Sequence, residues 1–205
     1  MLRVDLSLLW SNQIEEMVKG IDEATINIIN YLEYRKSNNF TDKYFDDLFN
    51  DILNVLKCWV GKTYIGDEKD KRLELSFQNF FIKFMELLIY FKNDESASNK
   101  ENKFANKCLF RGKVYRYLGH NESQGKHKKI KPIYNEIYVS WSKLNKIPYI
   151  ESKLNGWMTL VSCEIEEPFY GIDLDALDIS RPHEKEVVFP TIEKLISDIK
   201  FIYNN

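Results

Sequence analysis

The spacing of hydrophobic residues changes part-way along this 205-residue chain. Up to about residue 92, apolar side chains recur every three or four residues, which is the spacing of a buried helix face. From about residue 108 they stand in short runs, rich in β-branched and aromatic residues, that Gly, Pro and Asn interrupt. Helical spacing followed by strand spacing predicts an α+β protein in which helices precede strands.

The first part of the chain, residues 1–92, predicts a helical bundle. Apolar stripes run from Trp10 to Leu32, from Phe45 to Trp59 and from Phe77 to Phe91, and polar segments separate them. Three amphipathic helices with short connections favour antiparallel packing around a shared core. The third stripe is the most aromatic, with Phe77, Phe80, Phe81, Phe84, Leu87, Leu88 and Phe91.

Residues 93–107 are polar and without periodicity, so we expect a linker there. Residues 108–205 then predict a second, mainly antiparallel β domain. The segment 195–203 is ambiguous between helix and strand, and we favour a strand. The expected strands are Leu109 to Leu118, Glu136 to Lys143, Met158 to Ile165, Phe169 to Leu174, Val187 to Phe189 and Leu195 to Tyr203.

Composition excludes several classes of protein. The formal net charge of -2 argues against a dedicated nucleic-acid binder. The three scattered cysteines form no CxxC pair or Cys/His cluster, so we expect reduced thiols and no metal site. No apolar run approaches the ~20 residues of a membrane span, and the N-terminus lacks a signal-peptide pattern. We therefore expect a cytoplasmic protein, in the producer or in a target cell, with no membrane partner.

Two glutamates, Glu184 and Glu186, stand directly before the run V-V-F-P. Residues two apart on a strand share a face, so both carboxylates are predicted to project together. Because like charges repel, the pair is either a solvated strand edge or part of a site. Glu164 and Glu166 have the same spacing, so the pair alone does not decide between these alternatives.

Two further stretches favour a site. Arg111 lies within a predicted strand and is followed by Gly112, which would let a ligand approach the backbone. Ser140 and Ser142 share a face of another strand, where hydroxyls can bind a carboxylate or a ribose. Arg116, in V-Y-R-Y, is an alternative to Arg111.

In this order the stretches F-R-G, Y-V-S-W-S and E-K-E-V-V-F-P resemble the motifs of the arginine–serine–glutamate class of mono-ADP-ribosyltransferases. The resemblance covers residues 108–203 only. Trp141 departs from it, since the class has threonine between the two serines, which puts the local packing in doubt. The resemblance implies a split, mainly antiparallel β-sheet core of ADP-ribosyltransferase type.

The resemblance also implies NAD as substrate and a role for each motif residue. Glu186 would stabilise the ribosyl cation, and Ser140 would hold Glu186. Arg111 would bind the NAD phosphate or the nicotinamide-side ribose, and Ser142 would assist at the nicotinamide end. Glu184 would orient an acceptor arginine of a protein target, and the loop Asp178 to His183 would touch that target.

Several alternatives remain open at this level. The same site could transfer ADP-ribose to a nucleic acid, or to water as an NAD glycohydrolase. A catalytically inactive binding module is the alternative from another class. The helical half could contact the target or an antitoxin, as in a toxin or effector, and nothing in its sequence chooses between these partners.

Overall fold

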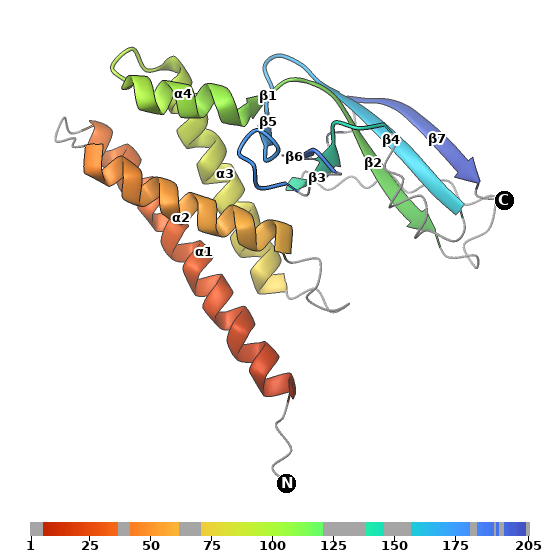
Figure 1. The fold of residues 1–205 in the computed structure, drawn as a ribbon, viewed down its shortest axis with the longest axis horizontal. Coiled ribbons are helices and arrows are strands. Elements are labelled where there is room, and N and C mark those ends of the chain that lie inside the picture. Colours follow the sequence, from red (N-terminus) through yellow and green to blue (C-terminus); the bar gives the residue numbers. More distant parts are fainter. Residues whose placement is uncertain are drawn as a thin grey trace, which may run out of the picture. The chain divides into compact units, whose positions relative to one another are not determined.

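A computed structural model of the protein describes residues 6–36, 42–61, 71–120, 138–145, 157–180, 184–190, 192 and 195–203. Within these residues four helices precede seven strand segments (Figure 1), which confirms the α+β class. The chain divides into two compact units, Met1–Ala105 and Asn106–Asn205. The segment 195–203, ambiguous in sequence, is a strand over nearly its whole length.

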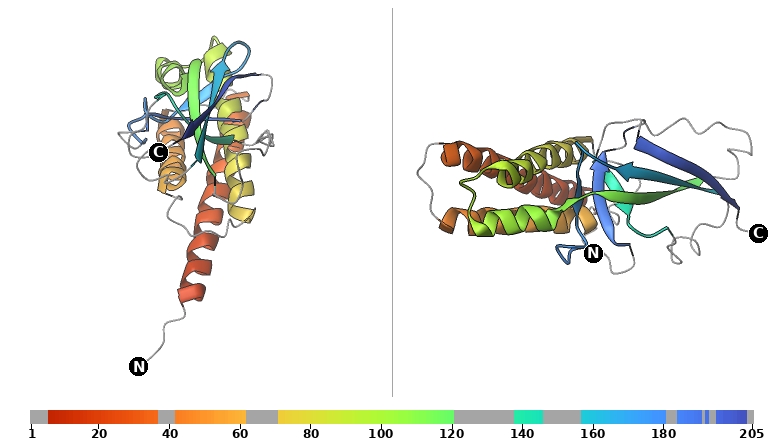
Figure 2. Two further views of the ribbon diagram at one scale, coloured as in Figure 1. Left: turned by 90° about the vertical axis from the view of Figure 1, so that its right-hand side faces the viewer. Right: turned by 90° about the horizontal axis from the view of Figure 1, so that it is seen from above.

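The helical unit contains α1 (Leu6–Lys36), α2 (Asp42–Gly61) and α3 (Lys71–Asn93), and α1 packs against both other helices (Figure 2). Trp59 of α2 meets the rings of Phe77 and Phe81 edge-on, with centroids 5.1 and 4.7 Å apart. Burying each large aromatic side chain stabilises the fold by about 1.5–3 kcal/mol. No helix within the described ranges is long and apolar enough to cross a membrane. All seven residues of the third stripe are fully buried: Phe77, Phe80, Phe81, Phe84, Leu87, Leu88 and Phe91.

The prediction of a polar linker over residues 93–107 is wrong for most of that segment, because Asn99–Cys108 forms the helix α4. Ser98 and Glu101 form a capping box at its start. The Ser98 N–H donates to the Glu101 carboxylate at 2.6 Å, and the Glu101 N–H donates to the Ser98 hydroxyl at 3.3 Å. The pattern Ser-x-x-Glu is visible in the sequence and was the available signal for this helix.

Glu101 is fully buried and joins α4 to α1. The Tyr31 hydroxyl donates to its carboxylate at 2.7 Å, and an Arg35 nitrogen lies 3.0 Å from the other carboxylate oxygen. Arg35 also donates to the Ser96 carbonyl at 3.1 Å and lies 3.7 Å from Asp94. A buried charge is stable only when it is paired and hydrogen-bonded, and Glu101 meets both conditions.

The strands of the second unit form one curled antiparallel sheet, a half-barrel, rather than two separate sheets. The order across it is β1-β5-β6-β3-β2-β4-β7. Only Arg111 separates β1 from β2, so the seven segments amount to six strands. The segments are β1 (Leu109–Phe110), β2 (Gly112–His120), β3 (Tyr138–Ser142), β4 (Trp157–Ile165), β5 (Gly171–Asp173), β6 (Glu186–Pro190) and β7 (Ile196–Tyr203).

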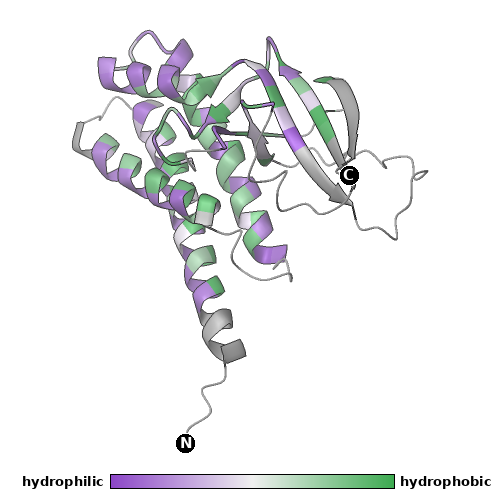
Figure 3. Ribbon diagram, turned by 45° about the vertical axis from the view of Figure 1, so that its right-hand side comes forward, coloured by the Kyte–Doolittle hydropathy of each residue, from purple (hydrophilic) through white to green (hydrophobic). Residues whose placement is uncertain are grey.

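The two faces of this sheet differ in chemistry. Alternation along the strands, visible as bands of hydropathy in Figure 3, sends one set of side chains into an apolar core. Trp141 belongs to this core, and its indole N–H donates to the Phe189 carbonyl at 3.1 Å. The tryptophan at position 141 is therefore a packing residue of this core. The core cluster is Val114, Trp141, Val161, Cys163, Ile165, Val187 and Phe189.

The three cysteines are free thiols with different environments, which predicts an order of reactivity. Cys108 and Cys163 are fully buried, and burial raises the pKa of Cys163 to about 12. Burial also raises the pKa of Cys58, which is only partly buried. Because the thiolate is the reactive form, one equivalent of Ellman's reagent is expected to react with the native protein at pH 8, at Cys58. Reaction of all three thiols without denaturant would contradict the buried positions.

Candidate active site

Ser140 and Glu186 meet across neighbouring strands. In the pairing of β3 with β6, Ser142 lies opposite Glu186 and Ser140 lies opposite Val188. Ser140 and Glu186 are therefore diagonal neighbours on one face, and the Ser140 hydroxyl donates to the Glu186 carboxylate. Glu186 is 4% exposed, whereas Ser140 is exposed. The structure thus brings together the serine and the glutamate that the sequence had paired.

The prediction that Glu184 and Glu186 share a strand face is wrong. The strand begins at Glu186, and Lys185 before it has φ = 44°, in the left-handed region. That conformation breaks the alternation of side chains, so Glu184 lies in a turn and not beside Glu186 on the sheet. The left-handed backbone conformation costs a residue with a side chain about 1–2 kcal/mol, so contacts around Lys185 must stabilise it.

Ser142 supplies one of these contacts. Its buried hydroxyl donates to the backbone carbonyl of Glu184 and accepts a hydrogen bond from the Leu144 N–H at 2.9 Å. The Lys143 N–H donates to the Lys185 carbonyl at 3.0 Å. In this structure the Ser142 hydroxyl is engaged with the turn that carries Glu184, and its role at the nicotinamide end stays a prediction.

A charged cluster beside β6 was not predicted from the sequence. The Lys143 ammonium lies 3.1 Å from Asp173 and 2.7 Å from Asp175, and Asp173 accepts the Ala176 N–H at 3.0 Å. The hydrogen bond from Lys143 holds the pKa of Asp175 below its usual range. Burial lowers the pKa of Lys143, but hydrogen bonds to Asp175 and Asp173 outweigh it and raise the value.

This cluster organises the segment that precedes the glutamates. The N–H groups of Leu174 and Asp175 both donate to the Glu186 carbonyl, at 3.0 and 3.3 Å. Side chain and backbone together therefore fix the start of β6. In the sequence, Lys143 directly follows the serine motif, and Asp173 and Asp175 form an Asp-x-Asp pair. Nothing in either pattern predicts that they form ion pairs with each other, because the strand pairing that brings them together is not visible in the sequence.

Arg111 lies between β1 and β2, and its described contacts are to the turn between β4 and β5. Its guanidinium donates to the Phe169 carbonyl at 3.3 Å, lies 3.3 Å from Glu167, and stands 4.0 Å above the Tyr170 ring. Tyr115, four residues beyond Arg111, is the position in register with Ser142, which faces Glu186. Four residues of chain separate Arg111 from this row, which is at most about 14 Å of extended chain. None of its described contacts is to Ser140 or Glu186.

Gly112 has a backbone reason to be glycine. Its φ of 133° lies in the region that favours glycine, and an added Cβ would stand 3.3 Å from the Phe110 ring. This conformation sits at the point where the chain passes from β1 to β2. Room for a ligand, the reason given from the sequence, is not needed to explain this glycine.

Arg116 lies on the apolar face of the sheet, opposite to Glu186. Arg116 pairs with the buried Val161 across the strands, whereas its neighbour Tyr115 pairs with Ser142 and so projects from the other face. Burial lowers the pKa of Arg116, and one of its terminal nitrogens is buried without a hydrogen bond among the described residues. This geometry disfavours Arg116 as the ligand-binding arginine and leaves Arg111.

Tyr115 is a candidate site residue that the sequence did not single out. Across the sheet, Glu186, Ser142, Tyr115 and Ser162 stand in register on one face. Tyr115 is partly exposed, with the Lys113 ammonium 5.9 Å from its ring centroid. Only the pairing of β2 with β3 reveals this row, since the two strands are separated by residues 121–137, which lie outside the described part of the chain.

Of the loop expected to touch an acceptor, Asp178 to Ser180 are described and 181–183 are not. Over the described residues, no three His, Cys, Asp or Glu side chains are grouped to hold a metal ion. Comparison of the chain with protein families, with curated proteins and with solved structures found no match.

Proposed function

We propose that this protein is a mono-ADP-ribosyltransferase that moves ADP-ribose from NAD to a protein arginine. The observation that carries the proposal is the hydrogen bond from Ser140 to the buried Glu186 carboxylate at the start of β6. The two residues come from separate motifs of one family pattern and are 46 positions apart in the chain. The antiparallel β unit that holds them is compatible with a sheet core of ADP-ribosyltransferase type.

The chemistry assigned to Glu186 is electrostatic. When the bond between nicotinamide and ribose C1′ breaks, nicotinamide leaves with the electron pair and positive charge develops on the ribose, as in glycoside cleavage. A fixed carboxylate beside that charge stabilises the transition state more than the bound substrate. The Ser140 hydroxyl holds the carboxylate in one orientation, so little reorganisation is needed during reaction.

Arg111 is proposed to bind the NAD diphosphate and not the reacting ribose. Its place away from Ser140 and Glu186 suits a phosphate group, which is separated from the nicotinamide ribose by several bonds. The guanidinium already stands beside a carboxylate, Glu167, which is 81% exposed. Such an exposed ion pair contributes less than about 1 kcal/mol, so a diphosphate can replace it. Tyr115 would offer a ring for stacking on the same sheet face as Glu186.

Glu184 is proposed to orient the acceptor guanidinium and to take its proton as nitrogen bonds to ribose C1′. Its place in the Lys185 turn, away from the strand face of Glu186, also supports a second candidate function. An NAD glycohydrolase needs Glu186 but no carboxylate for an arginine, because water is the acceptor. The two functions share the NAD site and differ only in the acceptor.

The test is incubation of the full-length protein with NAD and cell lysate, with nicotinamide release and protein mass measured together. Addition of ADP-ribose to arginine side chains is the expected result. Nicotinamide release without incorporation into protein would support the glycohydrolase, and incorporation into nucleic acid would identify that acceptor. NAD at 100 times its dissociation constant should add about 2.7 kcal/mol to the free energy of unfolding. If saturating NAD left the free energy of unfolding unchanged, the proposal would give way to a catalytically inactive binding module that does not bind NAD.

The two arginines provide a matched pair of variants. Arg111→Met is expected to weaken NAD binding by about tenfold to a hundredfold, since a charge-assisted contact to diphosphate is worth about 1.5–3 kcal/mol. Arg116→Met is expected to leave NAD binding unchanged. It should leave the free energy of unfolding unchanged or raise it by about 1–2 kcal/mol, because a desolvated charge becomes an apolar side chain. Isothermal titration with NAD and urea unfolding measure the two quantities, and reversed effects would contradict the assignment.

A further inference from the structure

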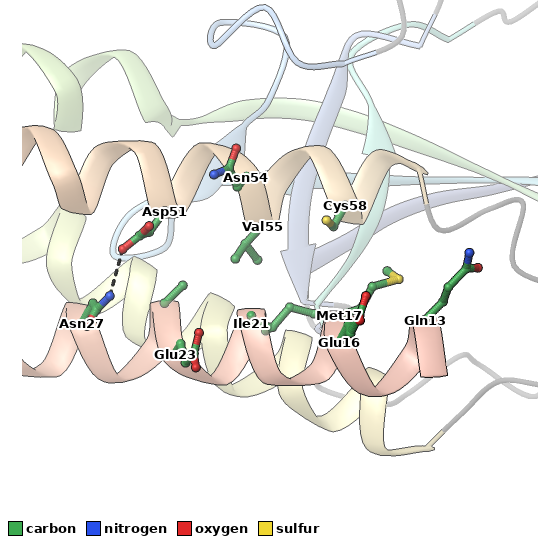
Figure 4. Close-up of a pocket in the computed structure, with 12 residues that line it drawn as sticks. Gln13, Glu16, Met17, Ile21, Glu23, Asn27, Asp51, Asn54, Val55 and Cys58 are labelled. Carbon is green, nitrogen blue, oxygen red and sulfur yellow. Dashed lines mark hydrogen bonds between the residues drawn. The ribbon is translucent and has the colours of Figure 1, made fainter. Parts of the chain in front are cut away.

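The helical unit carries a groove between α1 and α2 that the proposed enzyme chemistry does not use. Figure 4 shows side chains of both helices facing a cavity of about 540 Å³. Ile21, Ala24 and Val55 are buried residues in its lining, and Met17 is partly buried beside them. Apolar side chains thus form the floor, although water can reach the space above them.

The rim of this groove is acidic. Glu16, Glu23 and Asp51 line it, and the twelve lining residues that the structure describes include no Lys, Arg or His. Lys19 stands outside the lining and lies 3.8 Å from Glu23, with both side chains mostly exposed. Such an exposed pair is weak, so it leaves the rim able to attract a positively charged partner.

A second cavity of about 290 Å³ continues the groove along the same two helices. Asn27 and Asp51 line both cavities, and the Asn27 amide donates to Asp51 at 2.8 Å where the two meet. The second cavity adds Asp47 and two exposed, stacked tyrosines, Tyr34 and Tyr44, with ring centroids 5.6 Å apart. Among the described residues of its lining there is likewise no Lys, Arg or His. From Gln13 to Tyr34 the groove follows α1 for about 30 Å at the helical rise.

We propose that the α1–α2 groove binds a basic amphipathic helix of a partner protein. A channel between two helices, with an apolar floor and polar rims, suits a third helix that presents an apolar stripe. The charge of the rim selects the partner: lysine and arginine beside the stripe would meet Glu16, Glu23, Asp47 and Asp51. An acidic helix would meet like charge on both sides. Binding of a helix in this groove requires no NAD, so its test is independent of the proposed function.

Gly20 offers a way to close the groove without disturbing the helices. It lines the cavity, and an added Cβ would meet no atom within 4 Å. A large side chain at this position therefore extends into the groove while the packing of α1 against its neighbours stays intact. Alanine at the same position fills little of the space and favours the helix over glycine, so Gly20→Ala is the matched control for Gly20→Trp.

The test uses the full-length protein and a synthetic peptide of leucine and lysine, about 20 residues long to match the groove, with leucines at helical spacing. Fluorescence anisotropy is expected to give a dissociation constant on the order of 10 µM at low salt. The same peptide with glutamate in place of lysine should bind at least tenfold more weakly. Raising the sodium chloride concentration to about 0.5 M should also weaken the lysine peptide, because it screens exposed charges. Equal binding of the two peptides would overturn the proposal.

Charge reversal on α1 distinguishes binding in the groove from attraction of the peptide by the net charge of the protein. Glu16→Arg with Glu23→Arg should weaken binding at least tenfold, whereas Glu15→Arg with Asp22→Arg should change it less than threefold. All four acids are exposed on one helix, but only Glu16 and Glu23 line the groove. Gly20→Trp should abolish binding and Gly20→Ala should retain it. Equal losses from the two charge reversals, or full binding by Gly20→Trp, would show that the peptide attaches elsewhere.

Discussion

Replacing Glu186 with glutamine is expected to lower both nicotinamide release and ADP-ribose transfer by about 10²–10³-fold, or about 3–4 kcal/mol. The carboxylate acts on charge that develops only in the transition state, and a neutral amide of the same shape cannot replace it. Glutamine still offers an oxygen to the Ser140 hydroxyl, so the fold should persist. Nicotinamide release and incorporation of ADP-ribose should be measured on the same samples, with circular dichroism as a check on folding.

Two further glutamates provide controls for this prediction. Glu184→Gln should abolish transfer to arginine and leave part of the NAD hydrolysis, because water needs less orientation than a guanidinium. Glu166→Gln should change neither activity, since Glu166 is exposed in the turn after β4. Small and equal effects from Glu184→Gln and Glu186→Gln would mean that Glu186 does not act on the ribosyl cation and that Glu184 does not act on the acceptor, which would contradict the proposed function.

Replacing Glu101 with alanine is expected to destabilise the helical unit by about 3–5 kcal/mol. The substitution removes one partner of a buried ion pair and leaves Arg35, whose side chain is 9% exposed, with a weaker partner in Asp94 at 3.7 Å. It also removes an acceptor from Tyr31 and the capping contact at the start of α4. Urea unfolding followed by circular dichroism at helical wavelengths measures the loss.

The control is a glutamate in an exposed ion pair of the same unit. Glu86 pairs with Lys83 at 2.8 Å on the surface of α3, with half of the Glu86 side chain exposed. Glu86→Ala should change the free energy of unfolding by less than about 0.5–1 kcal/mol. If Glu86→Ala and Glu101→Ala lowered the free energy of unfolding by similar amounts, the buried Glu101 ion pair would contribute no more to stability than an exposed one, which would contradict the prediction.

Local periodicity was enough to predict most of the secondary structure. The stripe from Phe77 to Phe91 predicted α3, and the V-V-F-P run predicted β6, because the spacing of buried side chains along an element depends on backbone geometry alone. The helix α4 was missed because its buried face consists of Glu101, Phe104, Ala105 and Cys108, a carboxylate and two small side chains around one aromatic ring, so its apolar pattern is weak. The capping pattern of Ser98 and Glu101 nevertheless indicates where this helix begins.

The sequence by itself determined the order of helices and strands, and the resemblance of its motifs led us to expect a contact between Ser140 and Glu186. Only the tertiary structure decided the register that brings these two into contact, that places Tyr115 in the same row, and that sends Arg116 to the apolar face. It also decided the left-handed turn at Lys185, which separates two glutamates that an extended strand would place side by side. Strand register and turn conformation depend on partners distant in the chain, whereas periodicity depends only on neighbours, and for that reason the sequence predicted the elements but not their pairing.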